Sequence, residues 1–125
     1  MAKATPDAVL DVFLIDIALS SILHVCSGQP ANYAGIAAVS LASVVLTPGD
    51  GNGDFVIAAD TSGRKLTTSQ QADIDIAVTG TATHIALAVT GSSTLKYVTT
   101  CTSQALVDTG TVTVPAWKIN IPQPT

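Results

Sequence analysis

Hydrophobic and polar residues alternate along much of this chain, most regularly between residues 80 and 101. A Gly91-Ser92-Ser93 turn divides this stretch into two halves. Period-two alternation on both sides of a short turn is typical of a β-hairpin. The segment therefore predicts two antiparallel strands that form a sheet with one buried face. The alternating positions are Ile85, Leu87 and Val89, then Leu95, Tyr97 and Thr99.

Further strands are expected on both sides of the Gly- and Asp-rich segment 48–54, which breaks regular structure and predicts a surface loop. In segment 73–78, Ile74, Ile76 and Val78 should point inward while Asp73 and Asp75 point outward. Residues 32–38, rich in Ala and Gly, predict an irregular connection. The other expected strands are 21–26, 39–46 and a strand that opens at 55 and ends by 60–63.

The last strand region, 111–121, contains a change of phase. Its apolar residues stand at even positions as far as Val114 and at odd positions from Trp117 onward. Both halves can face one core only if the alternation shifts at Pro115-Ala116. We therefore expect a β-bulge or a crossing between sheets at this point, on an edge that tolerates proline.

The N-terminal segment predicts a helix over about 5–19, with Thr5 as N-cap, Pro6 at the first helical position and Asp7 in the first turn. Two environments are compatible with such an apolar helix: the space between two layers of the fold, or contact with a neighbouring subunit. Because 13–17 is rich in β-formers, a strand is the alternative there. The predicted common face is Val9, Leu10, Phe13, Leu14 and Ile17, with Val12, Ile15 and Leu19 on other sides.

These elements predict a mainly β fold, either an antiparallel β-sandwich or a partly open barrel, with one N-terminal helix. The 125 residues form a single domain, with a β-rich region over about 21–121 and a short extended tail at 122–125.

Composition narrows the range of functions. Charged residues make up only 11% of the chain, against roughly 25% in typical domains, and the formal net charge is −4. A nucleic-acid partner is not expected, since phosphate binding needs clustered Lys and Arg. A surface of small and hydroxyl side chains loses little on desolvation, which favours contact with protein. No stretch is apolar enough to predict a membrane span.

Candidate chemistry is sparse. Asp50, Asn52 and Asp54 match the first three ligand positions of an EF-hand loop, but Phe55 and Thr61 stand where that loop needs Gly and Glu. Calcium is therefore a weak alternative to an ordinary turn. A zinc site or a Cys–His pair built from His24, Cys26, His84 and Cys101 lacks the usual spacing.

The remaining polar groups favour structural roles. Asp73 and Asp75 are interpreted as surface charges, and Cys26 and Cys101 as free thiols rather than a disulfide. Arg64-Lys65 could bind an anion, but pairing with Asp residues of an adjoining subunit is the preferred interpretation. No phosphate-binding, nucleotide-binding or hydrolase motif is present, so neither an enzyme nor a cofactor is expected.

Several segments resemble a group of small tailed-bacteriophage proteins. The resemblance covers nearly the whole chain, through residues 5–11, 26–33, 60–65, 80–87, 97–106 and 114–119. It includes the Thr-Pro-Asp-Ala-Val-Leu-Asp start, the Cys-Ser-x-Gln-Pro-x-x-Tyr turn and the Val-Pro-Ala-Trp-Lys-Ile segment. It implies a virion structural protein, made in the host cytoplasm and kept in the virion, without deciding between head and tail.

The function expected from this resemblance is capsid decoration, in which the chain bridges copies of the major capsid protein or of itself as a homo-oligomer or part of a larger assembly. A tail, collar or fibre-base component is the structural alternative. A host-surface module that binds glycan is the alternative of another class, with Trp117 and Tyr97 as its platforms. The candidate interface residues are Val9, Phe13, Ile17, Arg64, Lys65, Pro115 and Trp117.

Overall fold

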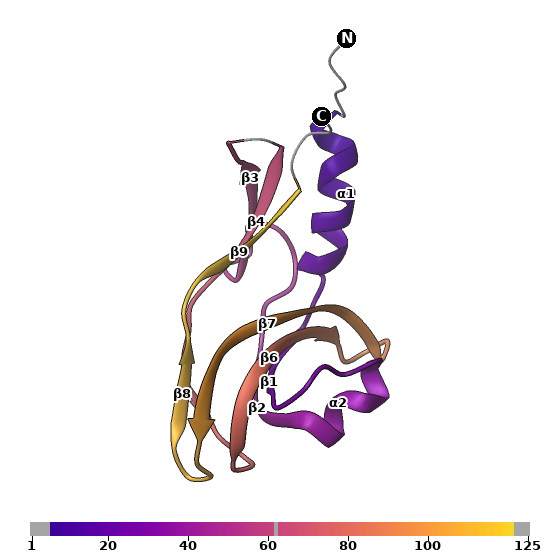
Figure 1. The fold of residues 1–125 in the computed structure, drawn as a ribbon. Helices are drawn as coiled ribbons and strands as arrows, with labels where there is room; N and C mark the ends of the chain where they lie inside the picture. Colours follow the sequence, from indigo (N-terminus) through magenta and orange to yellow (C-terminus); the bar gives the residue numbers. More distant parts are fainter. Residues whose placement is uncertain (1–5, 62, 122–125) are drawn as a thin grey trace.

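The computed structural model describes residues 6–61 and 63–121, and it confirms the mainly β fold with antiparallel sheets and an N-terminal helix (Figure 1). Neither described helix is long and apolar enough to cross a membrane. The elements in chain order are α1 Asp7–Ala18, β1 Ile22–Cys26, α2 Tyr33–Val39, β2 Ser40–Val45, β3 Phe55–Ala59, β4 Arg64–Thr68, β5 Gln71–Asp75, β6 Gly80–Val89, β7 Thr94–Leu106, β8 Thr111–Val114 and β9 Trp117–Ile121.

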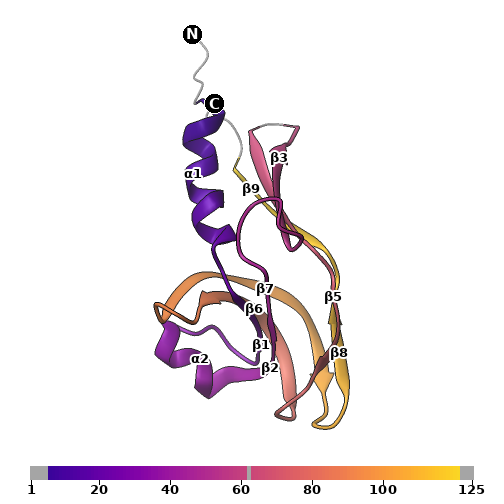
Figure 2. The same ribbon diagram turned by 180° about the vertical axis from the view of Figure 1, so that it is seen from behind.

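The strands form three antiparallel sheets, with orders β2-β1-β6-β7, β3-β4-β9 and β5-β8. An isolated antiparallel bridge between Ala42 and Ile76 connects the first sheet to the end of the third. Figures 1 and 2 show β5 and β8 on one side of the four-stranded sheet and α2 on the other, with α1 beside β3, β4 and β9. The three described sheets do not close into a ring, which is consistent with a sandwich or an open barrel.

The phase change at Pro115-Ala116 is confirmed as a crossing between sheets. Before it, β8 pairs with β5, and after it, β9 pairs with β4. Val112, Val114 and Ile119 are all buried, so the shift keeps the apolar side chains of both strands on the core side.

The β6–β7 hairpin is confirmed, but the expectation of a single buried face is wrong for its central part. Ile85 and Leu87 are buried as predicted, and Ala86 and Ala88 on the opposite face are fully buried as well. Figure 1 shows α2 on that second side, and α2 contacts the neighbouring strand β1. The alanines are therefore core residues, and their small size allows close approach.

The irregular connection expected over 32–38 is wrong, because this segment contains α2. Asn32 is the N-cap, and its side-chain oxygen accepts a hydrogen bond from the Gly35 N–H at 2.8 Å. Ile36 is buried and anchors the helix. The helix has only seven residues, too few for its apolar positions to show a clear period of 3.6. The Asn32 N-cap was therefore the feature of the sequence that could have predicted it.

The start of α1 differs by one position from the prediction. Pro6 occupies the cap position without a side-chain cap, and Asp7 is the first helical residue. The predicted cap Thr5 and the predicted tail 122–125 lie outside the described residues. The helix continues through Phe13 and Ile17 to Ala18, so the strand alternative for this segment is wrong.

The inward position predicted for Val78 is also wrong. Ile74 and Ile76 are buried as expected, but β5 ends at Asp75 and Val78 is 51% exposed. The N–H groups of Ala77 and Val78 both donate to the Leu41 carbonyl, at 2.9 and 3.1 Å. The chain has left the strand at this point, so strand alternation no longer applies.

Candidate interaction surface

Helix α1 has two faces of similar hydrophobicity but opposite exposure. Leu10, Leu14, Ile17 and Ala18 are buried, and the helix contacts β3, β4 and β7. The rest of its apolar surface is exposed, and we refer to it as the α1 stripe, formed by Ala8, Val9, Val12, Phe13 and Ile15 of the helix and by Leu19, which directly follows it. The five large side chains of the stripe are between 47% and 64% exposed. Exposed apolar side chains that gather on one element are a feature of interaction sites in soluble proteins.

Residues of the helix face predicted from the sequence differ in their exposure. Leu10, Leu14 and Ile17 share the buried face, but Val9 and Phe13 are 59% and 51% exposed. The candidate interface residue Ile17 is only 2% exposed and belongs to the chain's own core. Because α1 is apolar almost all round, hydrophobicity alone did not distinguish its two faces.

Two carboxylates of α1 are paired with basic groups of the same chain. The Arg64 Nε and Nη2 atoms donate to Asp11 at 2.8 and 3.3 Å, a bidentate contact. The Lys96 Nζ donates to Asp16 at 3.0 Å. The Arg64–Asp11 pair fixes α1 to β4 within the chain, while the expected pairing of Arg64 with an adjoining subunit stays a prediction.

The other basic residue of the predicted pair, Lys65, is partly exposed on β4. The hydrogen bond from the Thr61 N–H, and to a smaller extent the ammonium groups of Lys118 and Lys65, lowers the pKa of Asp60. Lys65 therefore interacts electrostatically with a carboxylate of its own chain, whose ion-pair partner is Lys118 at 3.4 Å.

An open groove lies beside the α1 stripe. Val9, Leu10 and Phe13 form one wall, and the facing wall comes from β7 and β9. Its volume is about 520 Å³. The candidates Val9 and Phe13 therefore belong to one continuous apolar surface that extends from the helix onto the sheet. The facing residues are Tyr97, Ile119, Asn120 and Ile121.

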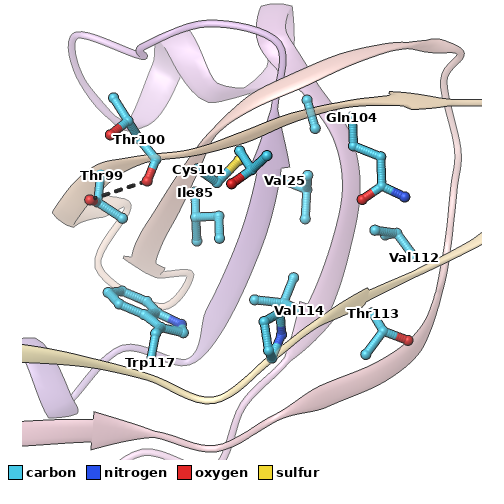
Figure 3. A pocket seen from close by; sticks show the side chains of 13 residues that line it. Val25, Ile85, Thr99, Thr100, Cys101, Gln104, Val112, Thr113, Val114 and Trp117 are labelled. Carbon is cyan, nitrogen blue, oxygen red and sulfur yellow. Dashed lines mark hydrogen bonds between the residues drawn. The ribbon is translucent and has the colours of Figure 1, made fainter.

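A second hollow lies between β7 and the β8–β9 crossing, with a volume of about 400 Å³ (Figure 3). Pro115 and Trp117, both predicted as interface residues, line it together with apolar groups and uncharged polar groups. The Trp117 ring stacks on Tyr97 at 6.1 Å between centroids, so these rings face each other. The apolar walls include Val25, Ile85, Val112 and Val114, and the polar lining includes Thr99, Cys101, Gln104 and Thr113.

The predicted His and Cys candidates do not form a metal site. The described residues contain no group of three His, Cys, Asp or Glu side chains that could share a metal ion. His24 Nδ1 lies 2.8 Å from the Ser40 hydroxyl, and burial lowers the pKa of His24. Cys26 stands opposite His84 in the β1–β6 register.

Both cysteines are free thiols, as predicted. Burial, and to a smaller extent the charge of Cys101, raises the pKa of Cys26 to about 11. Burial also raises the pKa of Cys101. The two thiols are therefore protonated at neutral pH, in which form they are poor nucleophiles and poor metal ligands.

The candidate calcium loop is held together by its own hydrogen bonds. Asp50 accepts the Ile57 N–H at 2.8 Å, and the Asn52 amide donates to the Pro48 carbonyl at 2.9 Å. The Asp50, Asn52 and Asp54 side chains all serve as local partners of the polypeptide, which is the role of an ordinary turn.

Asp54 is the centre of this network. It accepts hydrogen bonds from the Thr47 N–H at 2.6 Å, the Ser69 hydroxyl at 2.8 Å and the Gln71 amide at 3.0 Å. Burial acts to raise the pKa of Asp54, but these hydrogen bonds together outweigh it and the pKa is lowered. The carboxylate therefore joins the loop to the start of β5.

We predict that Asp54→Asn lowers the free energy of unfolding at pH 7 by about 1–2 kcal/mol, because it weakens charge-assisted hydrogen bonds. A lowered folded-state pKa stabilises the protein above the unfolded value, about 3.9, and this contribution is lost as the pH falls through the folded value. Urea unfolding at pH 7 and near pH 2 should show the difference between variant and wild type shrinking in acid. The exposed Asp75→Asn is the control, and an equal loss for both variants would refute the role of Asp54.

Three features of the site were not predicted from the sequence. Val12, Ile15 and Leu19 were not candidates, although their spacing along α1 was a visible signal. The ion pairs Asp11–Arg64 and Asp16–Lys96 join residues far apart in sequence and left no local pattern. The hollow beside Trp117 is lined by several strands, which only tertiary structure brings together.

In comparisons with known proteins, the sequence matches no protein-family model and no curated protein, and no solved structure matches it.

Proposed function

We propose that this chain is a structural protein of a tailed-bacteriophage virion that decorates the capsid and stabilises it through protein–protein contacts. The observation that carries the proposal is the α1 stripe, an apolar helix face that the described part of the chain leaves exposed. A helix that is apolar all round is normally buried on all sides. Its outward side therefore fits a surface that becomes covered on assembly.

The energetics of the stripe support an adhesive role. Fully burying a Val, Leu, Ile or Phe side chain contributes about 1.5–3 kcal/mol, and roughly half of that remains available from each half-exposed side chain. Asp11 and Asp16 are already paired within the chain, so covering the stripe requires no new partner for either carboxylate. The proposed mechanism follows from linkage, since a ligand that binds only the assembled shell stabilises that shell.

Heat resistance of the shell tests this function. Purified chain is added to phage heads that lack it, and release of DNA from the heads is followed during heating. We expect the release temperature to rise with occupancy, because binding at about 100 times Kd contributes about 2.7 kcal/mol per site. A bovine serum albumin control should give no rise.

The same preparation separates the alternatives. A copy number per virion similar to that of the major capsid protein supports decoration, whereas a few copies would support a tail, collar or fibre-base component. Binding of the isolated chain to host cells, without any effect on heads, would support glycan recognition instead.

A further inference from the structure

Four residues of the α1 stripe follow a regular spacing. Ala8, Val12, Ile15 and Leu19 are separated by four, three and four positions, and all four are exposed. Alternating steps of three and four are the seam of a heptad repeat, which allows two helices to pack at a shallow angle. The exposed side of α1 is therefore patterned to receive another helix.

The sizes of these side chains indicate which helix fits. When the seam meets an identical seam running in the opposite direction, Ala8 faces Leu19 of the partner subunit and Val12 faces Ile15 of the partner subunit. Each layer then combines a smaller side chain with a larger one, so the layers fill evenly. In a parallel pair each residue would face its own copy, leaving a gap between the two alanines and crowding the two leucines.

The charges on α1 are compatible with contact between two copies, although each chain carries a formal charge of −4. Asp16 interrupts the stripe and is paired with Lys96 at 3.0 Å. Asp11, at the border of the stripe, is paired with Arg64 at 2.8 Å. Two stripes can therefore meet without bringing together either of these carboxylates in unpaired form.

In the described part of the chain, no sheet covers the outer side of α1. Figures 1 and 2 show α1 standing above the four-stranded sheet, with β3, β4 and β9 on one side only. Ala8, Val12, Ile15 and Leu19 lie on the side of α1 opposite to the residues that pack on the core. An antiparallel partner would place its own sheet beyond the other end of the helix pair.

We propose that the α1 stripe binds the α1 stripe of a second copy of this chain, antiparallel and about a twofold axis. The interface is isologous, since the same residues contribute on both sides. This inference rests on the proposed function only in taking the stripe as a contact surface. It specifies the partner of that surface.

The oligomeric state of the purified full chain tests the inference first. Sedimentation equilibrium over a concentration series should show a reversible monomer–dimer equilibrium. Val12→Lys should lower the association constant at least about tenfold, because it places an ammonium group in the seam. The matched control Val45→Lys, at a 78% exposed position on β2, should dimerise like the wild type. A chain that stays monomeric throughout, or a Val12→Lys variant that dimerises normally, would overturn the inference.

Cross-linking tests the direction of the helices and does not depend on Val12→Lys folding. Val12→Cys and Ile15→Cys are prepared separately in a Cys101→Ser background and oxidised with copper phenanthroline. A mixture of the two variants should form disulfide-linked dimers faster than either variant alone, because positions 12 and 15 face each other in the antiparallel pair. Faster linking by one single variant alone would contradict the proposed register.

These measurements use purified chain without phage heads, so they separate the inference from the proposed function. A monomeric chain that still stabilises heads would overturn the antiparallel dimer and leave capsid decoration standing. A dimer with no effect on the heat resistance of heads would support the antiparallel pair and overturn capsid decoration.

Discussion

Phe55→Ala should lower the free energy of unfolding by about 3–5 kcal/mol, the range for removing a buried Phe side chain. Phe55 is fully buried at the start of β3 and belongs to the core cluster that joins α1 and the sheets. Since domains of this kind are stable by about 5–15 kcal/mol, the loss is a large part of the total. Urea unfolding followed by circular dichroism measures it.

The neighbouring residue is the matched control. Val56 is 48% exposed and points away from the core, so Val56→Ala should change the free energy of unfolding by only about 0.5 kcal/mol. Similar losses for the two variants would mean that β3 does not share the core with the rest of the domain. The contrast between adjacent residues thus tests the assigned faces of this strand.

The sequence predicted the structure best where side chains alternate strictly between the two faces of a strand. The phase change at Pro115-Ala116 correctly located a crossing between sheets, because a one-residue shift exchanges the two faces of a strand. The β6–β7 hairpin followed from its turn and its alternation. These predictions depend on local geometry, which the sequence contains.

Predictions failed where burial depends on distant segments. The face of α1 could not be assigned from a helix that is apolar all round, and the burial of Ala86 reflects the α2 side of the sheet. Arg64 and Asp11 are 53 positions apart, so their pairing within one chain could not be read from either local sequence. The α1 stripe could be identified as an interaction surface only once the structure showed which side of α1 packs on the core.

Val12→Lys should weaken binding of the chain to phage heads by about 100-fold or more. A dimer that joins two head-binding chains gains roughly 10²–10⁴ in avidity over a single chain, and this gain is lost when the stripe is disrupted. Val12 is 64% exposed in the single chain, so at concentrations at which the wild type is monomeric the free energy of unfolding of the variant should stay within about 0.5 kcal/mol of the wild type. Weaker binding would then reflect a lost contact and not a damaged fold.

Val45→Lys adds the same charge on β2, at a position 78% exposed and outside the α1 stripe. It controls for the effect of charge on adsorption to the heads. Its binding curve should coincide with that of the wild type.

The amount of chain bound per head, measured by co-sedimentation over a concentration series, tests most directly whether the α1 stripe contributes to decoration of the capsid. Wild type and Val45→Lys should saturate the heads at similar concentrations, while Val12→Lys should need a far higher concentration. Equal binding by all three proteins, or no binding by the wild type, would contradict the account.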